Sequence, residues 1–204
     1  MTSMSNPFDD VGSASIVAFH DQRIAIGARA LAADPPGEAW EHIAANHRCN
    51  HLLWDEEDQA RRSDVPDAAI AANKRAIDGY NQKRNDAIER IDETLLARLS
   101  GVAPDADAWH NSETAGAMID RLSILALKVH HMRSQTLRSD ATPEHVAACT
   151  EKLARLSLQR EDLARCLDTL LARAAQGRAF WRIYRQFKMY TDPALNPWLY
   201  RKPA

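Results

Sequence analysis

The sequence lacks the features of several large protein classes. Only three of its 204 residues are cysteine, and their scattered positions, without a CxxC pair, argue against a disulfide framework or a cysteine-built zinc site. No apolar run reaches the roughly 18 residues that a membrane-spanning helix needs. The opening run MTSMSNPFDD lacks the basic and apolar regions of a signal peptide. We therefore expect a cytoplasmic protein with no membrane partner.

An excess of charge of one sign is also missing. The chain has 26 Lys and Arg against 28 Asp and Glu, which gives a net charge of −2. Proteins that hold a nucleic-acid backbone normally carry a basic excess, so no nucleic-acid partner is predicted. The length fits one domain of roughly 100–200 residues. We predict a single domain over residues 1–204, in which residues 1–12 are flexible.

Glycine and proline are scarce, with 7 and 9 residues, and most of them separate long segments rich in alanine, leucine and arginine. Glycine and proline at such positions are typical of the ends of helices. The pattern predicts an all-α fold, an antiparallel bundle of about five long helices. The last of these carries a leucine stripe at helical spacing, which indicates a buried face. The helices are expected at residues 13–32, 36–62, 66–100, from 112 onward, and from 142 to near 177.

The segment from Arg178 onward differs in composition from the rest. It holds six basic residues against one acidic residue, Asp192, and seven of the 13 aromatic residues. Such a mixture can bind nucleic acid, a phosphorylated ligand or a membrane surface, or it can dock on a bundle with arginine over aromatic rings. An amphipathic pattern at Phe180, Ile183, Tyr184 and Phe187 favours docking. We predict a C-terminal helix and an irregular tail over residues 178–204, docked beside the pocket described next.

Polar residues lie in line with apolar ones on three of the predicted helices. Burying an unpaired ionised group costs several kcal/mol, so these residues either form a network that fixes helix register or face a polar pocket between helices. The stripe of the second helix is Trp40, Ile43, His47, His51, Trp54, Asp58 and Arg61. The third helix carries Lys74, Asp78, Asn81, Asn85, Glu89 and Asp92, and the fourth carries Glu113, Asp120 and His131.

These stripes also carry a resemblance to a known family. The blocks from His47 to Arg61, from Lys74 to Asp92 and from Glu113 to Met132, with Gln186 to Pro197, are similar to the bacterial family called domain of unknown function 4254; Thr191 stands where the resemblance implies asparagine. The family has no assigned activity, and its members look like neighbours of cell-surface glycan genes. Because the blocks coincide with the polar stripes and miss the leucine stripe, the resemblance favours a pocket.

Two hypotheses follow for function. The leading one is a small-molecule enzyme of unknown reaction, with an acid–base or metal-assisted pocket between the second, third and fourth helices for a nucleotide- or sugar-type ligand. The alternative is a non-catalytic partner of a biosynthetic enzyme, or a homo-oligomer, with the polar residues as a structural network. The catalytic candidates are His47, Asp58, Asp78, Glu113 and Asp120. The ligand-binding candidates are Asn50, Trp54, Arg61, Lys74, Asn81, Asn85, Lys128 and His131.

Motifs for metal or serine chemistry are weak. His47 and His51 have the spacing of two ligands on one helix, but the glutamate of HExxH is absent, and the inward helices carry no Glu-x-x-His motif of a di-iron bundle. The carboxylate pair Asp55 and Asp58 suits Mg²⁺. We predict no tightly bound metal and leave weak Mg²⁺ binding open. No GxSxG motif is present, and helical spacing supplies no base for Ser123.

Overall fold

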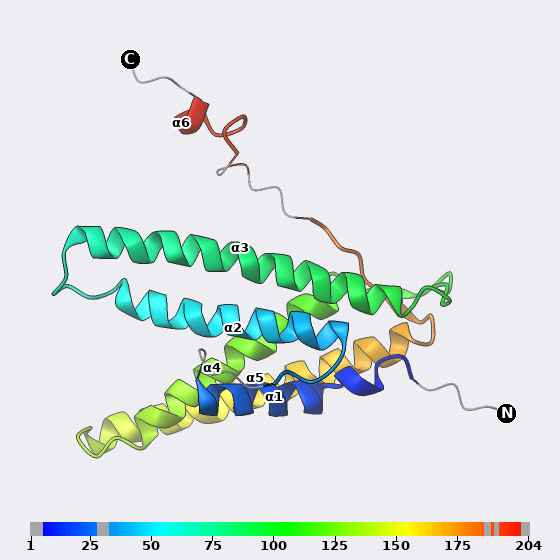
Figure 1. Cartoon of the computed structure of the whole chain (residues 1–204). Coiled ribbons are helices and arrows are strands. Elements are labelled where there is room, and N and C mark those ends of the chain that lie inside the picture. Colours follow the sequence, from blue (N-terminus) through cyan, green and yellow to red (C-terminus); the bar gives the residue numbers. More distant parts are fainter. Residues whose placement is uncertain (1–5, 28–32, 186–188, 190–191, 201–204) are drawn as a thin grey trace.

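The architecture is all-α, as predicted (Figure 1). A computed structural model describes residues 6–27, 33–185, 189 and 192–200. Five long helices account for most of this part of the chain. They are α1 (Ser13–Ile26), α2 (Glu38–Gln59), α3 (Asp67–Ala97), α4 (Ala115–Thr136) and α5 (Pro143–Ala174), and the short elements are η1 (Asp9–Val11), β1 (Trp109–His110), β2 (Ala179–Phe180) and α6 (Pro197–Tyr200).

Local signals define most of the helix ends. The side chains of Thr114 and Thr142 cap α4 and α5 by accepting hydrogen bonds from the backbone N–H groups three residues on, which satisfies donors that a helix start leaves unpaired. The predicted end of the first helix at Ala32 is wrong. It ends at Ile26, because Gly27 adopts a φ of 87° and its N–H closes the last turn; residues 28–32 lie outside the described part.

The long helices pack as two antiparallel hairpins, α2 with α3 and α4 with α5. Helix α4 runs obliquely past the α2–α3 hairpin, so the two hairpins separate toward the loop between α2 and α3 (Figure 1). The core fills the region where they meet, and α1 covers α4 and α5. The fully buried side chains of the core include Ile43, Ile91, Leu95, Ile119, Leu122, Leu167 and Leu170. The leucine stripe of α5 is therefore core, as predicted.

The first described residues contribute to this core. Residues 1–12 were expected to be flexible, but Phe8 is 2% exposed and Val11 is fully buried. The indole Nε1 of Trp40 donates a hydrogen bond to the Asp10 carbonyl at 3.1 Å. The stretch from Asn6 is thus packed, because it supplies two apolar side chains that the bundle buries.

The segment after α5 is extended between Arg178 and Arg185, where a helix was predicted. Gly177 has a φ of 73°, which turns the chain out of α5. Strand β2 then pairs in parallel with β1: the Trp109 N–H donates to the Arg178 carbonyl at 3.0 Å and the Asn111 N–H to the Phe180 carbonyl at 2.9 Å. Helical periodicity was therefore misleading here, because these backbone groups are paired with another segment.

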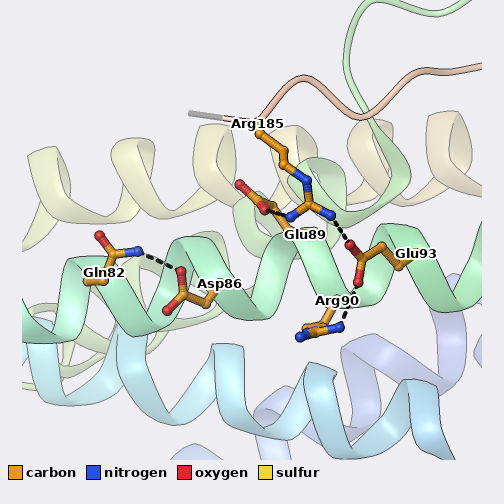
Figure 2. Close-up of polar contacts among 6 residues, drawn as sticks. All are labelled: Gln82, Asp86, Glu89, Arg90, Glu93 and Arg185. Atoms are coloured by element: carbon orange, nitrogen blue, oxygen red, sulfur yellow. Dashed lines mark hydrogen bonds and ion pairs between the residues drawn. The ribbon is translucent and has the colours of Figure 1, made fainter. Parts of the chain in front are cut away.

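Residues 178–185 dock on the bundle, as predicted, but the described residues further along do not, because α6 lies away from the bundle (Figure 1) and Trp198 is 88% exposed. Trp181 is 3% exposed and belongs to the core. The Arg185 guanidinium forms ion pairs with Glu89 and Glu93 on α3 (Figure 2). Tyr184 is 68% exposed, and Phe187 lies outside the described residues. Docking thus depends on one buried tryptophan and an ion pair instead of the helical face that we expected.

None of the described helices is long and apolar enough to cross a membrane.

Candidate functional site

A buried polar cluster joins α2 to α4, and Asp120 is at its centre. The Nδ2 groups of Asn46 and Asn50 each donate a hydrogen bond to Asp120 Oδ1 at 2.8 Å. All three side chains are buried. Two amide donors on one oxygen hold the orientation of the carboxyl group. The cluster therefore presents a fixed carboxylate inside the bundle.

The same cluster places a histidine beside Ser123. Asn50 Nδ2 also donates to Ser123 Oγ at 3.0 Å, and Ser123 Oγ lies 2.7 Å from His47 Nδ1. Since the hydroxyl accepts from Asn50, we assign its proton to the bond with Nδ1, which leaves the His47 proton on Nε2. Burial, with a smaller effect of His51, lowers the pKa of His47 to about 3, so the ring is neutral.

The expectation that Ser123 has no base nearby is therefore wrong, because the packing of α2 against α4 brings His47 to it. Both side chains are buried, however, with Ser123 fully inaccessible and His47 2% exposed. A hydroxyl with no exposed surface cannot meet a ligand from solvent. In this structure the Ser123–His47 pair positions Asn50, which in turn holds Asp120.

A second histidine completes the buried end of the cluster. His20 of α1 stacks on His47 with ring centroids 4.5 Å apart, and it is fully buried. Neither of its ring nitrogens has a hydrogen-bond partner among the described residues. Burial, followed by the effects of His47 and Arg160, lowers its pKa well below the ordinary value. His20 was not predicted, because it lies on a helix that carries no comparable polar stripe.

A cleft of about 450 Å³ lies beside this cluster, between α2, α3 and α4. This is the region in which we predicted a pocket. Its walls combine apolar side chains with amides, two arginines and two carboxylates. The residues that line it are Asn50, Leu53, Trp54, Glu57, Asp58, Arg61, Asn81, Arg84, Ile124 and Leu127. Five of the predicted site residues are therefore brought together here: Asn50, Trp54, Asp58, Arg61 and Asn81.

Arg84 also lines the cleft, although it was not among the predicted catalytic or ligand-binding residues. Its Nε is buried, has no hydrogen-bond partner in the described part of the chain, and lies 4.0 Å from Asp120 Oδ1. The guanidinium is thus close enough to attract Asp120 but too far for a normal hydrogen bond. The arginine follows Asn81 by three residues, so the i, i+3 neighbour rule could have placed it on the same face.

Trp54 and His131, both predicted, support one wall of the cleft. Their rings stack with centroids 4.3 Å apart and an angle of 4° between the planes. Burial, with a smaller effect of the neighbouring His130, lowers the pKa of His131. The stacked imidazole holds the indole plane, which makes Trp54 a rigid surface for a ligand.

Five predicted residues lie away from this cleft, namely Lys74, Asp78, Asn85, Glu113 and Lys128. Lys74 and Asp78 form an exposed ion pair at 2.8 Å along α3, because the oblique α4 does not reach that end of the helix (Figure 1). Glu113 pairs with Arg121 at 2.7 Å on α4, and Lys128 is exposed. These positions share a helical face with true cleft residues, but sequence spacing does not specify where α4 crosses α3.

A second cleft of about 450 Å³ lies between α3, the start of α4 and the C-terminal segment. Its lining includes Asn85 and Glu113, both predicted, together with Asp92. Asp92 is 1% exposed, and its Oδ1 accepts a hydrogen bond from the Gly116 N–H at 2.8 Å. Burial raises the pKa of Asp92 to about 6, although hydrogen bonding by Thr114, Gly116 and Trp181 opposes the rise. The Trp181 indole N–H lies near Asp92 without a hydrogen bond of normal geometry.

Gly116 allows this close approach of α4 to α3. A Cβ at this position would lie 2.6 Å from the Ile88 carbonyl oxygen and 2.8 Å from Asp92 Oδ2. Because backbone must move to accommodate it, we expect Gly116→Ala to lower the free energy of unfolding by about 3 kcal/mol, measured by urea denaturation. Gly79 of α3 is the matched control, since a Cβ there meets nothing within 4 Å, and Gly79→Ala should stabilise the protein by about 1 kcal/mol. Equal effects of the two substitutions would contradict the close packing.

Among the described residues, no group of three or more His, Cys, Asp and Glu side chains is placed to hold a metal ion. The pair Asp55 and Asp58 therefore has no third such ligand within that part of the chain. Weak Mg²⁺ binding stays a prediction that an activity assay has to include.

Comparison with known proteins identifies a family and nothing closer. The model of a family described as protein of unknown function (DUF4254) matches residues 40–183. No curated protein and no solved structure matches the chain. The matched region contains every residue that lines the α2–α3–α4 cleft and all of the buried cluster except His20.

Proposed function

The chain belongs to the DUF4254 family, and from its own side chains we propose that it is a small-molecule enzyme whose substrate binds in the α2–α3–α4 cleft. The description of the family assigns no reaction. The observation that carries the proposal is that the side-chain amides of Asn46 and Asn50 both donate hydrogen bonds to Asp120 beside the cleft. Such pre-organisation of a buried carboxylate is typical of a group that reacts with, or orients, a ligand.

Asp120 is the residue that we assign to proton transfer. Its Oδ1 takes both amide hydrogen bonds, so Oδ2 is the oxygen left for a ligand, and 11% of the side chain is exposed. A carboxylate held in this way accepts a proton from a bound hydroxyl or amine as that group reacts. The guanidinium of Arg84 lies 4.0 Å from Oδ1 and is the cationic neighbour of this carboxyl group.

Substitution of Asp120 tests this proposal. We expect Asp120→Asn to lower kcat by roughly 10²–10⁴-fold in a screen of nucleotides and sugar phosphates with Mg²⁺ present, while the folded structure is retained because the amide oxygen still accepts from Asn46 and Asn50. Asp78→Asn is the control, since Asp78 belongs to an exposed pair, and it should change stability by no more than about 1 kcal/mol without affecting turnover. Full turnover by Asp120→Asn would refute the catalytic role.

The interaction hypothesis predicts a different outcome for the same variant. If the cluster only fixes helix register, Asp120→Asn should change neither turnover nor ligand affinity, and Asp120→Ala, which leaves both amides unpaired, should destabilise the bundle by several kcal/mol. A helical partner of a biosynthetic enzyme, a homo-oligomer and a location in the cytoplasm all stay predictions. We favour the enzyme because the cluster lies against an open cleft and because Arg84 has hydrogen-bonding capacity left over.

A further inference from the structure

The charges in the α2–α3–α4 cleft point to the chemistry of its ligand. We infer that the ligand is a small polyhydroxylated molecule with one anionic group, phosphate or carboxylate, which binds Arg84 while a hydroxyl binds Asp120. This inference rests on the proposed function, because it assigns the substrate class of the same cleft.

Of the two arginines in the cleft, Arg84 is the one with unused donors. Arg61 already pairs with Glu57 at 3.0 Å and donates to the Glu57 carbonyl. Arg84 has Asp120 as its ionic neighbour at 4.0 Å, and its buried Nε lacks a partner within the described residues. A guanidinium presents a planar set of donors that matches carboxylate and phosphate oxygens. Arg84 lines the cleft and 27% of its side chain is exposed, so its guanidinium can meet an anion from solvent even though the Nε atom itself is buried.

The surface beside Arg84 consists of acceptors. Both Nδ2 hydrogens of Asn50 are used, by Asp120 and Ser123, so the amide oxygen is the group that Asn50 can offer to a ligand in the cleft. Asp120 is not itself a lining residue, but its side chain is 11% exposed next to Arg84, and its Oδ2 is a further acceptor there. The part of the ligand next to its anionic group therefore has to supply donors, and hydroxyl groups do so without adding a charge.

Charge balance limits the ligand to a single anionic group. Of the charged residues that line the cleft, Glu57 and Arg61 neutralise each other, and Asp58 together with the adjacent Asp120 opposes more than one further negative charge at Arg84. One guanidinium is left for one anion. The remaining wall is Trp54, held by His131, with Leu53, Ile124 and Leu127, which suits the C–H face of a compact ring. A cleft of about 450 Å³ falls in the range for small-molecule sites.

Titration calorimetry with four probes tests the inference: glucose 1-phosphate and ribose 5-phosphate for the phosphate source, glucuronate for the carboxylate source, and glucose without an anionic group. We expect at least one anionic probe to bind the full chain, and Arg84→Met to weaken that probe at least 10-fold. Arg90→Met is the matched control, because Arg90 lies exposed on the same helix and pairs with Glu93 (Figure 2); it should bind as the wild type does. Should Arg84→Met fail to fold, Arg84→Lys keeps the charge, loses the planar donor set and should still bind more weakly than the wild type.

The outcomes separate this inference from the proposed function. If glucose binds as tightly as the anionic probes, or if Arg84→Met binds them as the wild type does, the anion assignment is overturned while the cleft and the role of Asp120 stand. If none of the probes binds the wild-type protein, the ligand class is overturned, and the Asp120→Asn assay still decides the catalytic role. If a phosphate probe binds the protein and glucuronate does not, the anionic group of the ligand is a phosphate.

Discussion

As the pH is lowered below 6.5, the free energy of unfolding should fall because of two buried histidines, by up to about 1.4 kcal/mol per pH unit for His47 and in the same direction for His20. Burial holds the pKa of both rings below the ordinary value of 6.5, and that of His47 at about 3. The unfolded chain therefore takes up protons that the folded chain excludes. This stabilising contribution is complete above pH 6.5 and is lost as the pH falls toward 3.

Urea denaturation at several pH values between 7 and 4 measures this effect. His20→Phe removes one of the two titrating rings and replaces ring nitrogens that have no hydrogen-bond partner, so its stability should depend less steeply on pH. His130→Gln is the control, because His130 is exposed on α4, and it should keep the wild-type dependence. The prediction fails if His20→Phe and the wild type lose stability in parallel.

Asp92 should partly offset this acid sensitivity. Its pKa in the folded protein is about 6, above the ordinary value of 3.8, so the folded chain binds this proton more tightly than the unfolded chain. The sign is therefore opposite, and the destabilisation caused by ionised Asp92 is relieved as the pH falls from 6 toward 4. Asp92→Asn, which cannot ionise, should make the protein more sensitive to acid than the wild type.

Trp181→Ala should destabilise the protein by about 3–5 kcal/mol, as expected for removal of a large buried aromatic side chain. Trp181 is 3% exposed and belongs to the same core cluster as the leucines of α5. Its indole N–H has no hydrogen-bond partner of normal geometry among the described residues, so we expect the loss to arise from packing. Trp181→Phe should recover part of the stability for the same reason.

Trp198 provides the matched control for this substitution. It lies in the same C-terminal segment but is 88% exposed, and Trp198→Ala should change the free energy of unfolding by less than about 0.5 kcal/mol. If Trp181→Ala unfolds at the same urea concentration as the wild type, the segment does not dock. A polyanionic or membrane partner for the basic tail would then be the better interpretation.

Most of the fold could be predicted because its signals are local. Thr142 and Pro143 begin α5, and glycine or proline separates each pair of neighbouring helices; each signal acts within a few residues. The exceptions depend on distant partners. The segment 178–185 has a helical pattern but pairs with residues 105–111, and no property of the segment alone indicates that pairing.

The site could be predicted in part. Asn50, Trp54, Asp58, Asn81 and Asp120 fall on inward helical faces, and helical periodicity is sufficient to find them. Ser123, Arg84 and His20 acquire their roles only when α4 crosses α2 and α3 at a particular angle and level. That angle results from side-chain packing over the whole interface, which one sequence does not reveal.

The pairing of β1 with β2 also constrains the order in which the molecule folds. It closes a loop of roughly 70 residues that contains α4 and α5, and closing a flexible loop of that length costs about 4 kcal/mol of chain entropy. Two strands of two residues each form too few hydrogen bonds to offset this cost alone. The α4–α5 hairpin therefore has to assemble first, and residues 178–181 join the bundle late. Local opening of the native protein should therefore begin with separation of β1 from β2. The backbone amide hydrogens of Trp109 and Asn111 should then exchange with solvent before those in the long helices.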